Sequence, residues 1–217
     1  MSDNVSMKIE DYLYVDKDAF WGVNQEYKQS VHGKAYKRYN IALEQLTSAE
    51  KNNVSINTII KYVQEFLEAN GIKTIPNPVF TEFPINYSKI KRNYNLRDER
   101  DIVWMKFAQI PNGEKHVLGV VAVSNDINFD IPPDASEYDL KIRIWNSNKN
   151  SYVEEWKWNS AGILLHKLGL VWDNTFVLVF PLSNIPPNYK RHDIEKAIGN
   201  YLTTNKVPII DYYSHLY

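Results

Sequence analysis

The spacing of apolar residues predicts two helices in the first third of the chain. Between residues 25 and 51, apolar and aromatic side chains recur at the interval of one helical face, at Tyr36, Tyr39, Leu43 and Leu46. Ser55 is a suitable N-cap for a second helix, and Gly71 stands where a left-handed glycine would end it. Its apolar stripe comprises Ile56, Ile59, Ile60, Val63 and Leu67. Two such helices can pair as a hairpin.

From residue 76 onwards the pattern changes to prolines and then to short β-branched and aromatic runs. Pro76, Pro78 and Pro84 exclude helix, and 79–83 is a candidate edge strand. The runs over 102–110, 116–124, 138–145, 152–158 and 175–180 are typical of strands. Asn112-Gly113 predicts a hairpin turn between the first two, and residues 146–150 predict another turn. Pro181 is expected to end the last of these strands.

Two further helices and a short strand are predicted towards the end of the chain. Residues 160–168 favour a short helix closed by Gly169. A last helix is expected from His192 or Asp193, and 207–210 can form a final strand. The expected buried face of this last helix comprises Ile194, Ile198, Tyr201 and Leu202.

This order of elements predicts an α+β fold. We expect an N-terminal helical hairpin, a mostly antiparallel sheet, and one or two C-terminal helices. The 217 residues suit a single domain, with a helical part over 1–75 and a sheet-containing part over 76–217. The regular β-α-β alternation of a doubly wound fold is absent.

The composition excludes several functional classes. Without cysteine the chain has no disulfides, no thiolate catalysis and no cysteine-ligated metal. A net charge of −1 provides no global field that would attract nucleic acid. No apolar run reaches the ~18 residues of a membrane span. Residues 1–6 lack the features of a secretion signal, so we expect a cytoplasmic protein. Abundant Asn, Lys, Ile and Tyr suggest a bacterial or phage genome.

The triplet Asp139-Leu140-Lys141 is the principal catalytic candidate. Residues two apart on a strand share a face, so its carboxylate and ammonium would be neighbours. The triplet resembles the metal-binding strand of PD-(D/E)xK nucleases. The resemblance implies that Asp139 binds Mg²⁺, that Lys141 assists the attacking water, and that a neighbouring strand supplies a second acid. Asp126 and Asp101 are the candidates for that acid. The alternative is an exposed ion pair on a sheet surface.

A second candidate is the acidic loop that begins at Asp126. Its oxygen-bearing side chains have the spacing of a calcium loop. Ile131 replaces the glycine that an EF-hand requires, and two prolines follow, so we exclude that motif. The sequence requires no cofactor, but a different Mg²⁺ or Ca²⁺ site is a hypothesis, with the ligands Asp126, Asn128, Asp130 and Asp139. The alternative is a polar surface turn.

The third candidate is a basic and aromatic segment within residues 87–97. Its cations could neutralise phosphates while a tyrosine stacks on a base; the candidate residues are Lys89, Lys91, Arg92 and Tyr94. Asp98 and Glu99 counter this charge, so a solvated connector or a short polar helix is the alternative.

The aromatic content favours a binding function. The chain has 15 Tyr, 6 Trp and 8 Phe, residue types enriched at interfaces. The aromatic segment 211–217 either docks onto the fold or contacts a partner. Because no complete catalytic set is present, our first hypothesis is a non-catalytic protein-binding or regulatory protein with a protein partner or a second copy. The alternative is an Mg²⁺-dependent nuclease that uses Asp126, Asp139 and Lys141, for which nucleic acid would be the substrate.

Overall fold

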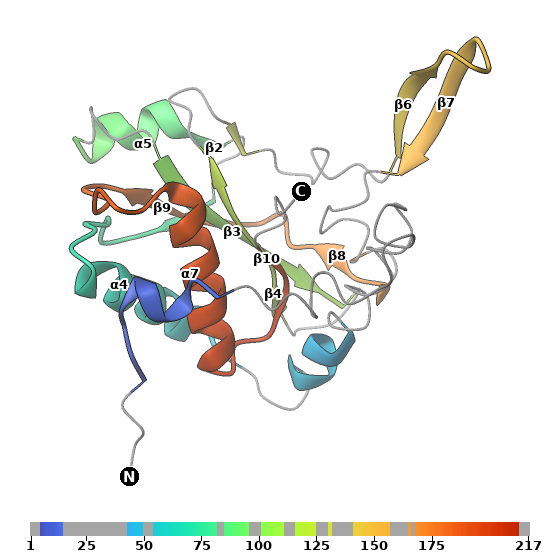
Figure 1. Cartoon of the computed structure of the whole chain (residues 1–217). Coiled ribbons are helices and arrows are strands. Elements are labelled where there is room, and N and C mark those ends of the chain that lie inside the picture. Colours follow the sequence, from blue (N-terminus) through green and yellow to red (C-terminus); the bar gives the residue numbers. More distant parts are fainter. Residues whose placement is uncertain are drawn as a thin grey trace.

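The computed structural model describes residues 5–14, 43–49, 54–81, 85–95, 101–110, 116–124, 130–131, 141–156, 165 and 168–212. These residues form an α+β fold, as predicted (Figure 1). Residues 43–49 are helical. The other elements are η1 (Ile9–Tyr12), α4 (Ile56–Ala69), β1 (Val79–Phe80), β2 (Ile85–Asn86), α5 (Tyr87–Asn93), β3 (Asp101–Gln109), β4 (His116–Ser124), β5 (Asp130–Ile131), β6 (Lys141–Asn146), β7 (Ser151–Trp156), β8 (Val171–Trp172), β9 (Val177–Leu182), α7 (Arg191–Thr204) and β10 (Ile209–Tyr212).

The main sheet has the strand order β1-β9-β3-β4-β10, and β8 pairs with the end of β3. Its pairs are antiparallel except β10, which runs parallel to β4. The β3–β4 register shifts by one residue between Lys106 and Phe107. Lys106 pairs with Val120, whereas Phe107 pairs with Leu118. Gly119 is therefore the extra residue of a β-bulge, a position that suits glycine.

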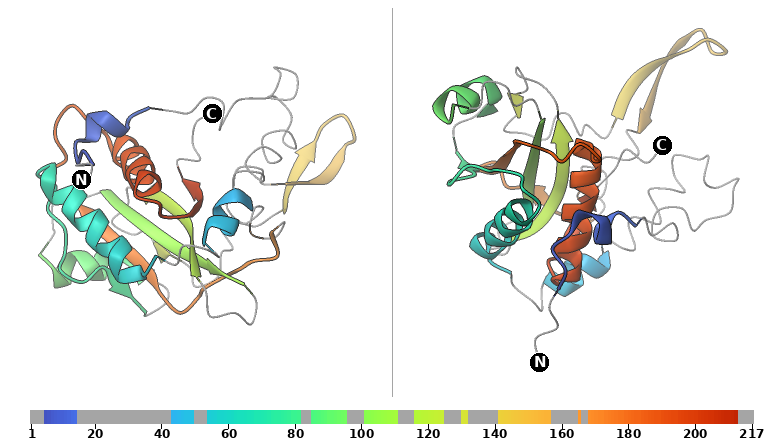
Figure 2. Two further views of the ribbon diagram at one scale, coloured as in Figure 1. Left: turned by 90° about the horizontal axis from the view of Figure 1, so that it is seen from below. Right: turned by 60° about the vertical axis from the view of Figure 1, so that its left-hand side comes forward.

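The central strand β3 is buried on both faces, since every residue from 102 to 108 is buried. Val103, Met105 and Phe107 belong to one apolar cluster, the first core, with residues of α4, α7 and η1. Ile102, Trp104 and Ala108 belong to another, the second core, with Ile90 of α5, Leu165 and Leu170. The alternation along β3 thus assigns one cluster to each face of the sheet. Figure 2 shows α4, α7 and η1 together against the sheet.

The caps predicted for α4 are confirmed. The Ser55 hydroxyl accepts a hydrogen bond from the Thr58 backbone N–H at 3.1 Å. At the other end, Gly71 has a φ of +74°. The Ile72 N–H reaches back to the Leu67 carbonyl at 3.0 Å, which satisfies an end-of-helix acceptor. The predicted apolar stripe of α4 lies in or against the first core.

The first predicted helix is described only over residues 43–49. Leu46 and Ala49 pack against the second core, whereas α4 packs in the first. Leu43, which the sequence places on the same helical face as Leu46, is 42% exposed. Gln45 reaches the edge strand β10, where its side-chain oxygen accepts the Ile209 N–H at 3.3 Å. This contact satisfies the Ile209 N–H, which is not used in the parallel pairing of β10 with β4.

The strand β9 continues through Pro181 to Leu182, although we expected the proline to end it. The Val179 N–H points towards the β1 side, because it donates to the Pro78 carbonyl at 2.8 Å. Two residues later the Pro181 nitrogen faces the same side, beyond the last pair with β1. No ladder hydrogen bond is lost there, so the proline is tolerated.

The helix α7 has the buried face that the sequence predicted, with Ile194, Ile198, Tyr201 and Leu202 all in the first core. The Asp193 carboxylate caps its first turn by accepting the Lys190 N–H at 2.9 Å. The strands β6 and β7 also form as predicted, but they pair with each other in a separate two-stranded sheet.

We predict that Gly199→Ala destabilises the protein although it removes a glycine from a helix. A Cβ at this position would overlap the Tyr212 ring, including its root atom Cγ. Overpacking of this kind costs about 1–3 kcal/mol, which exceeds the ~1 kcal/mol helix preference of alanine. In a Tyr212→Ala background the same substitution should stabilise α7. Urea denaturation of the four proteins measures both signs, and destabilisation of equal size in both backgrounds would contradict the contact.

Candidate interaction and catalytic sites

The β6–β7 hairpin has a defined register. Alternate pairs share one of its faces, and these are Lys141–Trp156, Arg143–Glu154 and Trp145–Tyr152. The other face carries the pairs Ile142–Glu155, Ile144–Val153 and Asn146–Ser151. Aromatic or aliphatic positions therefore occur on both faces, which differs from a ribbon with one polar side.

This hairpin projects away from the main sheet (Figure 1). Its tip, residues 147–150, is a turn of exposed residues closed by the Asn150 N–H and the Ser147 carbonyl at 3.3 Å. Asn150 has a φ of +45°, which asparagine tolerates better than most residues. Among the described strands, β6 and β7 pair only with each other. Two-stranded ribbons are marginally stable alone.

The catalytic candidates fall mostly outside the described residues. That is the case for Asp126, Asn128 and Asp139, whereas Lys141 begins β6 and Asp130 pairs with Asn86 in the small β2–β5 ladder. The structure therefore neither joins nor separates these groups. Among the residues it does describe, no three His, Asp or Glu side chains gather as a metal site would require.

Asp101 is one of the two acids considered as a partner for Asp139. It begins β3 in the main sheet, and Arg191 of α7 approaches its carboxylate at 3.3 Å. The strand beside Lys141 is β7, where Glu154 shares the hairpin face of Lys141 one pair away. A turn over 146–150 would pair residue 145 with 151 and place Glu154 on the opposite face from Lys141, whereas the observed turn over 147–150 pairs Asn146 with Ser151.

The basic segment forms a short helix, which is one of the alternatives that the sequence left open. Lys89, Lys91 and Arg92 lie on α5, and Lys89 and Arg92 are exposed. They stand three residues apart, so they share one side of the helix. Tyr94 follows the helix and is half-buried against the second core. Its part in stacking on a base stays a prediction, while its packing role is visible.

A buried lysine on β3 escaped the sequence reading. Lys106 is fully buried, and its ammonium lies 5.3 Å from the centre of the Trp172 ring on β8. An ammonium is costly to bury without such compensation. The next residue after Trp172, Asp173, is also buried and donates its N–H to the Phe107 carbonyl at 2.8 Å. The sequence signal for this buried lysine was its position as the single charged residue within the apolar run 102–108.

The first turns of α7 hold a second polar group that the sequence did not reveal. His192 Nδ1 lies 3.4 Å from a carboxylate oxygen of Glu195, whose side chain is fully buried. The other Glu195 oxygen and the Arg191 Nε are buried and have no hydrogen-bond partner among the residues that the structure describes. A carboxylate that orients an imidazole is a common catalytic arrangement, but the described residues around this pair contain no complete catalytic set.

Comparison with known proteins identifies no relative, because no family model, curated protein or solved structure matches this chain. Within the described parts, none of the helices has the length and apolar character that crossing a lipid bilayer requires.

We predict that Lys106 and Trp172 are energetically coupled. Trp172→Leu removes the ring that faces the buried ammonium, so it should cost more in the wild type than in a Lys106→Met background. The expected coupling free energy is about 1–2 kcal/mol, as for desolvated cation–aromatic pairs. Guanidinium denaturation of the double-mutant cycle measures it. A coupling near zero would show that the ring contributes only packing.

Proposed function

We propose that this protein acts by binding protein, that its β6–β7 hairpin is the contact element, and that the hairpin of a second copy is its partner. The observation that carries the proposal is the isolated ribbon with aromatic or aliphatic positions on both faces. Burial of the Trp145, Tyr152 and Trp156 positions of one face in a two-layer contact would supply the stabilisation that a two-stranded ribbon lacks.

The distribution of charge supports a second copy as the partner. The strand β6 carries Lys141 and Arg143 and no acid, whereas β7 carries Glu154 and Glu155 and no base. A two-fold axis parallel to the ribbon and between two stacked hairpins would place β6 of one copy over β7 of the other. On the face of Lys141 and Arg143, the Arg143 position of each copy would then lie opposite the Glu154 position of the other, which favours this pairing over others.

The proposal predicts reversible dimerisation. Sedimentation equilibrium of the wild type between ~1 and ~100 µM should give a Kd in the micromolar range, and Trp145→Ala with Tyr152→Ala should weaken it at least about tenfold. Leu43→Ala is the control, because Leu43 is 42% exposed and lies outside both the hairpin and residues 5–14, and it should leave the Kd unchanged. A wild type that stays monomeric throughout this range contradicts the proposal.

A second candidate function is the Mg²⁺-dependent nuclease. The register favours it at one point, since Glu154 stands on the strand beside Lys141 and on the same hairpin face. It can serve as the second acid that the triplet Asp139-Leu140-Lys141 needs. Asp126 stays a further candidate for that position. In this function, Lys89, Lys91 and Arg92 would contact phosphates.

The nuclease candidate predicts metal-dependent cleavage of labelled DNA or RNA. With Mg²⁺ or Mn²⁺, Asp139→Asn, Lys141→Met and Glu154→Gln should each reduce the rate at least about a hundredfold, because each removes a metal ligand or the water-activating group. Glu155→Gln is the matched control on the opposite hairpin face. Equal cleavage by all five proteins, or none by the wild type, would contradict this function.

Two broader parts of the proposal rest on composition. The absence of cysteine and the residue bias support a cytoplasmic protein of a bacterium or phage. Dimerisation through the hairpin would require no cofactor, whereas the nuclease candidate would need a divalent cation.

A further inference from the structure

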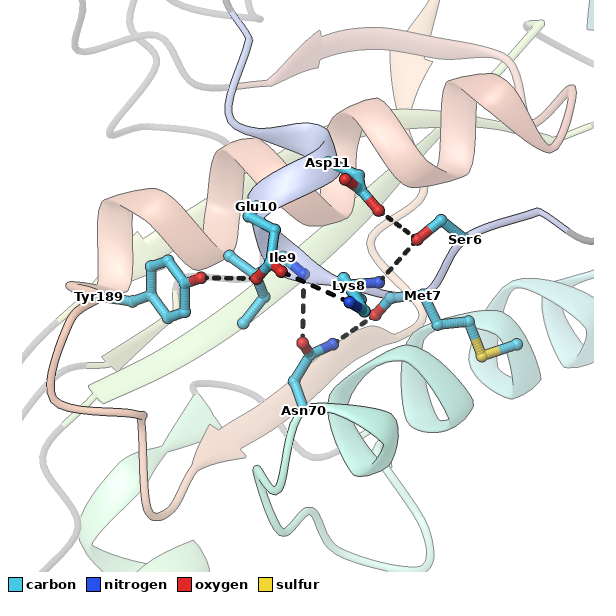
Figure 3. A network of polar contacts seen from close by, with 8 residues as sticks. All are labelled: Ser6, Met7, Lys8, Ile9, Glu10, Asp11, Asn70 and Tyr189. Carbon is cyan, nitrogen blue, oxygen red and sulfur yellow. Dashed lines mark hydrogen bonds and ion pairs between the residues drawn. The ribbon is translucent and has the colours of Figure 1, made fainter.

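The N-terminal arm, residues 5–14, is bound across α4 and α7 although it is distant from both in sequence (Figure 3). Its side-chain anchors are Ile9 and Tyr12, which are 0% and 5% exposed. The Tyr12 ring packs edge-on against Phe66 of α4 at 5.7 Å and against Tyr201 of α7 at 5.4 Å between centroids. Burial raises the pKa of both Tyr12 and Tyr201 above the usual value, so both hydroxyls stay neutral at physiological pH.

Two asparagines hold the backbone of the arm. Asn70 accepts the Ile9 N–H at 3.1 Å and donates to the Met7 carbonyl at 2.6 Å (Figure 3). Asn200 donates to the carbonyls of Tyr12 and Tyr14, each at 2.8 Å. We call the surface formed by Asn70, Phe66, Asn200 and Tyr201 the arm site. The asparagines of the arm site bind backbone atoms, which every peptide has. Selectivity for the sequence of the bound segment therefore depends on the anchors Ile9 and Tyr12.

The arm also holds its own shape. The Tyr12 hydroxyl donates to the Ser6 carbonyl at 2.6 Å. The Ser6 hydroxyl donates to the Asp11 carboxylate and accepts the Lys8 N–H at 3.3 Å. A segment with these internal bonds loses less conformational entropy on docking than an unstructured peptide does.

One side chain connects the arm site to the end of the sheet. Asn200 is buried, and its oxygen accepts the Tyr212 hydroxyl of β10 at 2.6 Å while its nitrogen holds the arm. Departure of the arm would leave that buried amide nitrogen without its two acceptors, a costly state. An arm in place is therefore the stable condition of the site, whichever chain supplies it.

We propose that the arm site is a peptide-binding site, that residues 5–14 are its ligand, and that the arm of a second copy binds there in trans. The ligand is a single helical turn with an aliphatic residue three positions before a tyrosine. None of its contacts requires arm and site to belong to one chain, which is the condition for exchange of a segment between copies. The 28 residues from 15 to 42 that connect the arm to the site lie outside the described part of the chain. This site is separate from the hairpin.

The test uses the full chain with a protease site inserted between residues 15 and 42. After cleavage, a fluorescent peptide of residues 5–14 should displace the retained arm and give saturable anisotropy with a micromolar Kd. The Tyr12→Ala peptide should bind at least about tenfold more weakly, because it lacks the larger anchor. A Val5→Ala peptide is the control, since Val5 is 40% exposed, and its affinity should change less than about twofold.

A second measurement covers the case in which the cleaved protein unfolds. The intact Tyr12→Ala chain has a weakened arm, so it should bind the wild-type peptide at least about tenfold more tightly than the intact wild type does. Equal binding by the two chains, or equal binding of the wild-type and Tyr12→Ala peptides, would overturn the proposal. The Trp145→Ala/Tyr152→Ala chain should bind the peptide with unchanged affinity, which separates this result from the fate of the hairpin proposal.

Discussion

Burial of both faces of β3 is the constraint on which the rest of this fold depends. Seven consecutive residues, 102–108, are withdrawn from water, so the sheet needs an apolar layer on each side. The helices α4 and α7 with η1 provide one layer, and residues of α5, of the segment 43–49 and of 165–170 contribute to the other. Elements from both ends of the chain must therefore converge on one strand.

The helix α7 is where the two ends of the described chain meet. Asn200 bonds both to the arm and to Tyr212 of β10. One residue earlier, Gly199 leaves the space that the Tyr212 ring occupies. A side chain at 199 and an apolar residue at 200 would each suit a helix better locally. Their present identities follow from what α7 has to hold, which is the arm on one side and the last strand on the other.

The β6–β7 hairpin and the N-terminal arm are the two places where the described contacts do not account for the residue types present. The β6–β7 hairpin forms the strands that its sequence favours, yet it carries apolar positions on both faces and has no other strand beside it in the described structure. Cover from a second copy would resolve that conflict. The arm presents the opposite case, because its backbone is fully engaged by asparagines that neither neighbouring residues nor helix propensity would require.

The sequence by itself determined the elements whose contacts are local. The Ser55 cap, the Gly71 terminus, the buried face of α7 and the turns that pair β3 with β4 and β6 with β7 all depend on residues within a few positions of each other. It did not determine that Glu154 shares the hairpin face of Lys141, since a shift of one residue in the turn moves a side chain to the other face. Only the tertiary structure placed β9 between β1 and β3, set β10 parallel to β4, buried Lys106 over Trp172 and paired Asp101 with Arg191. These outcomes depend on contacts between residues far apart in the chain, whose geometry no local periodicity encodes.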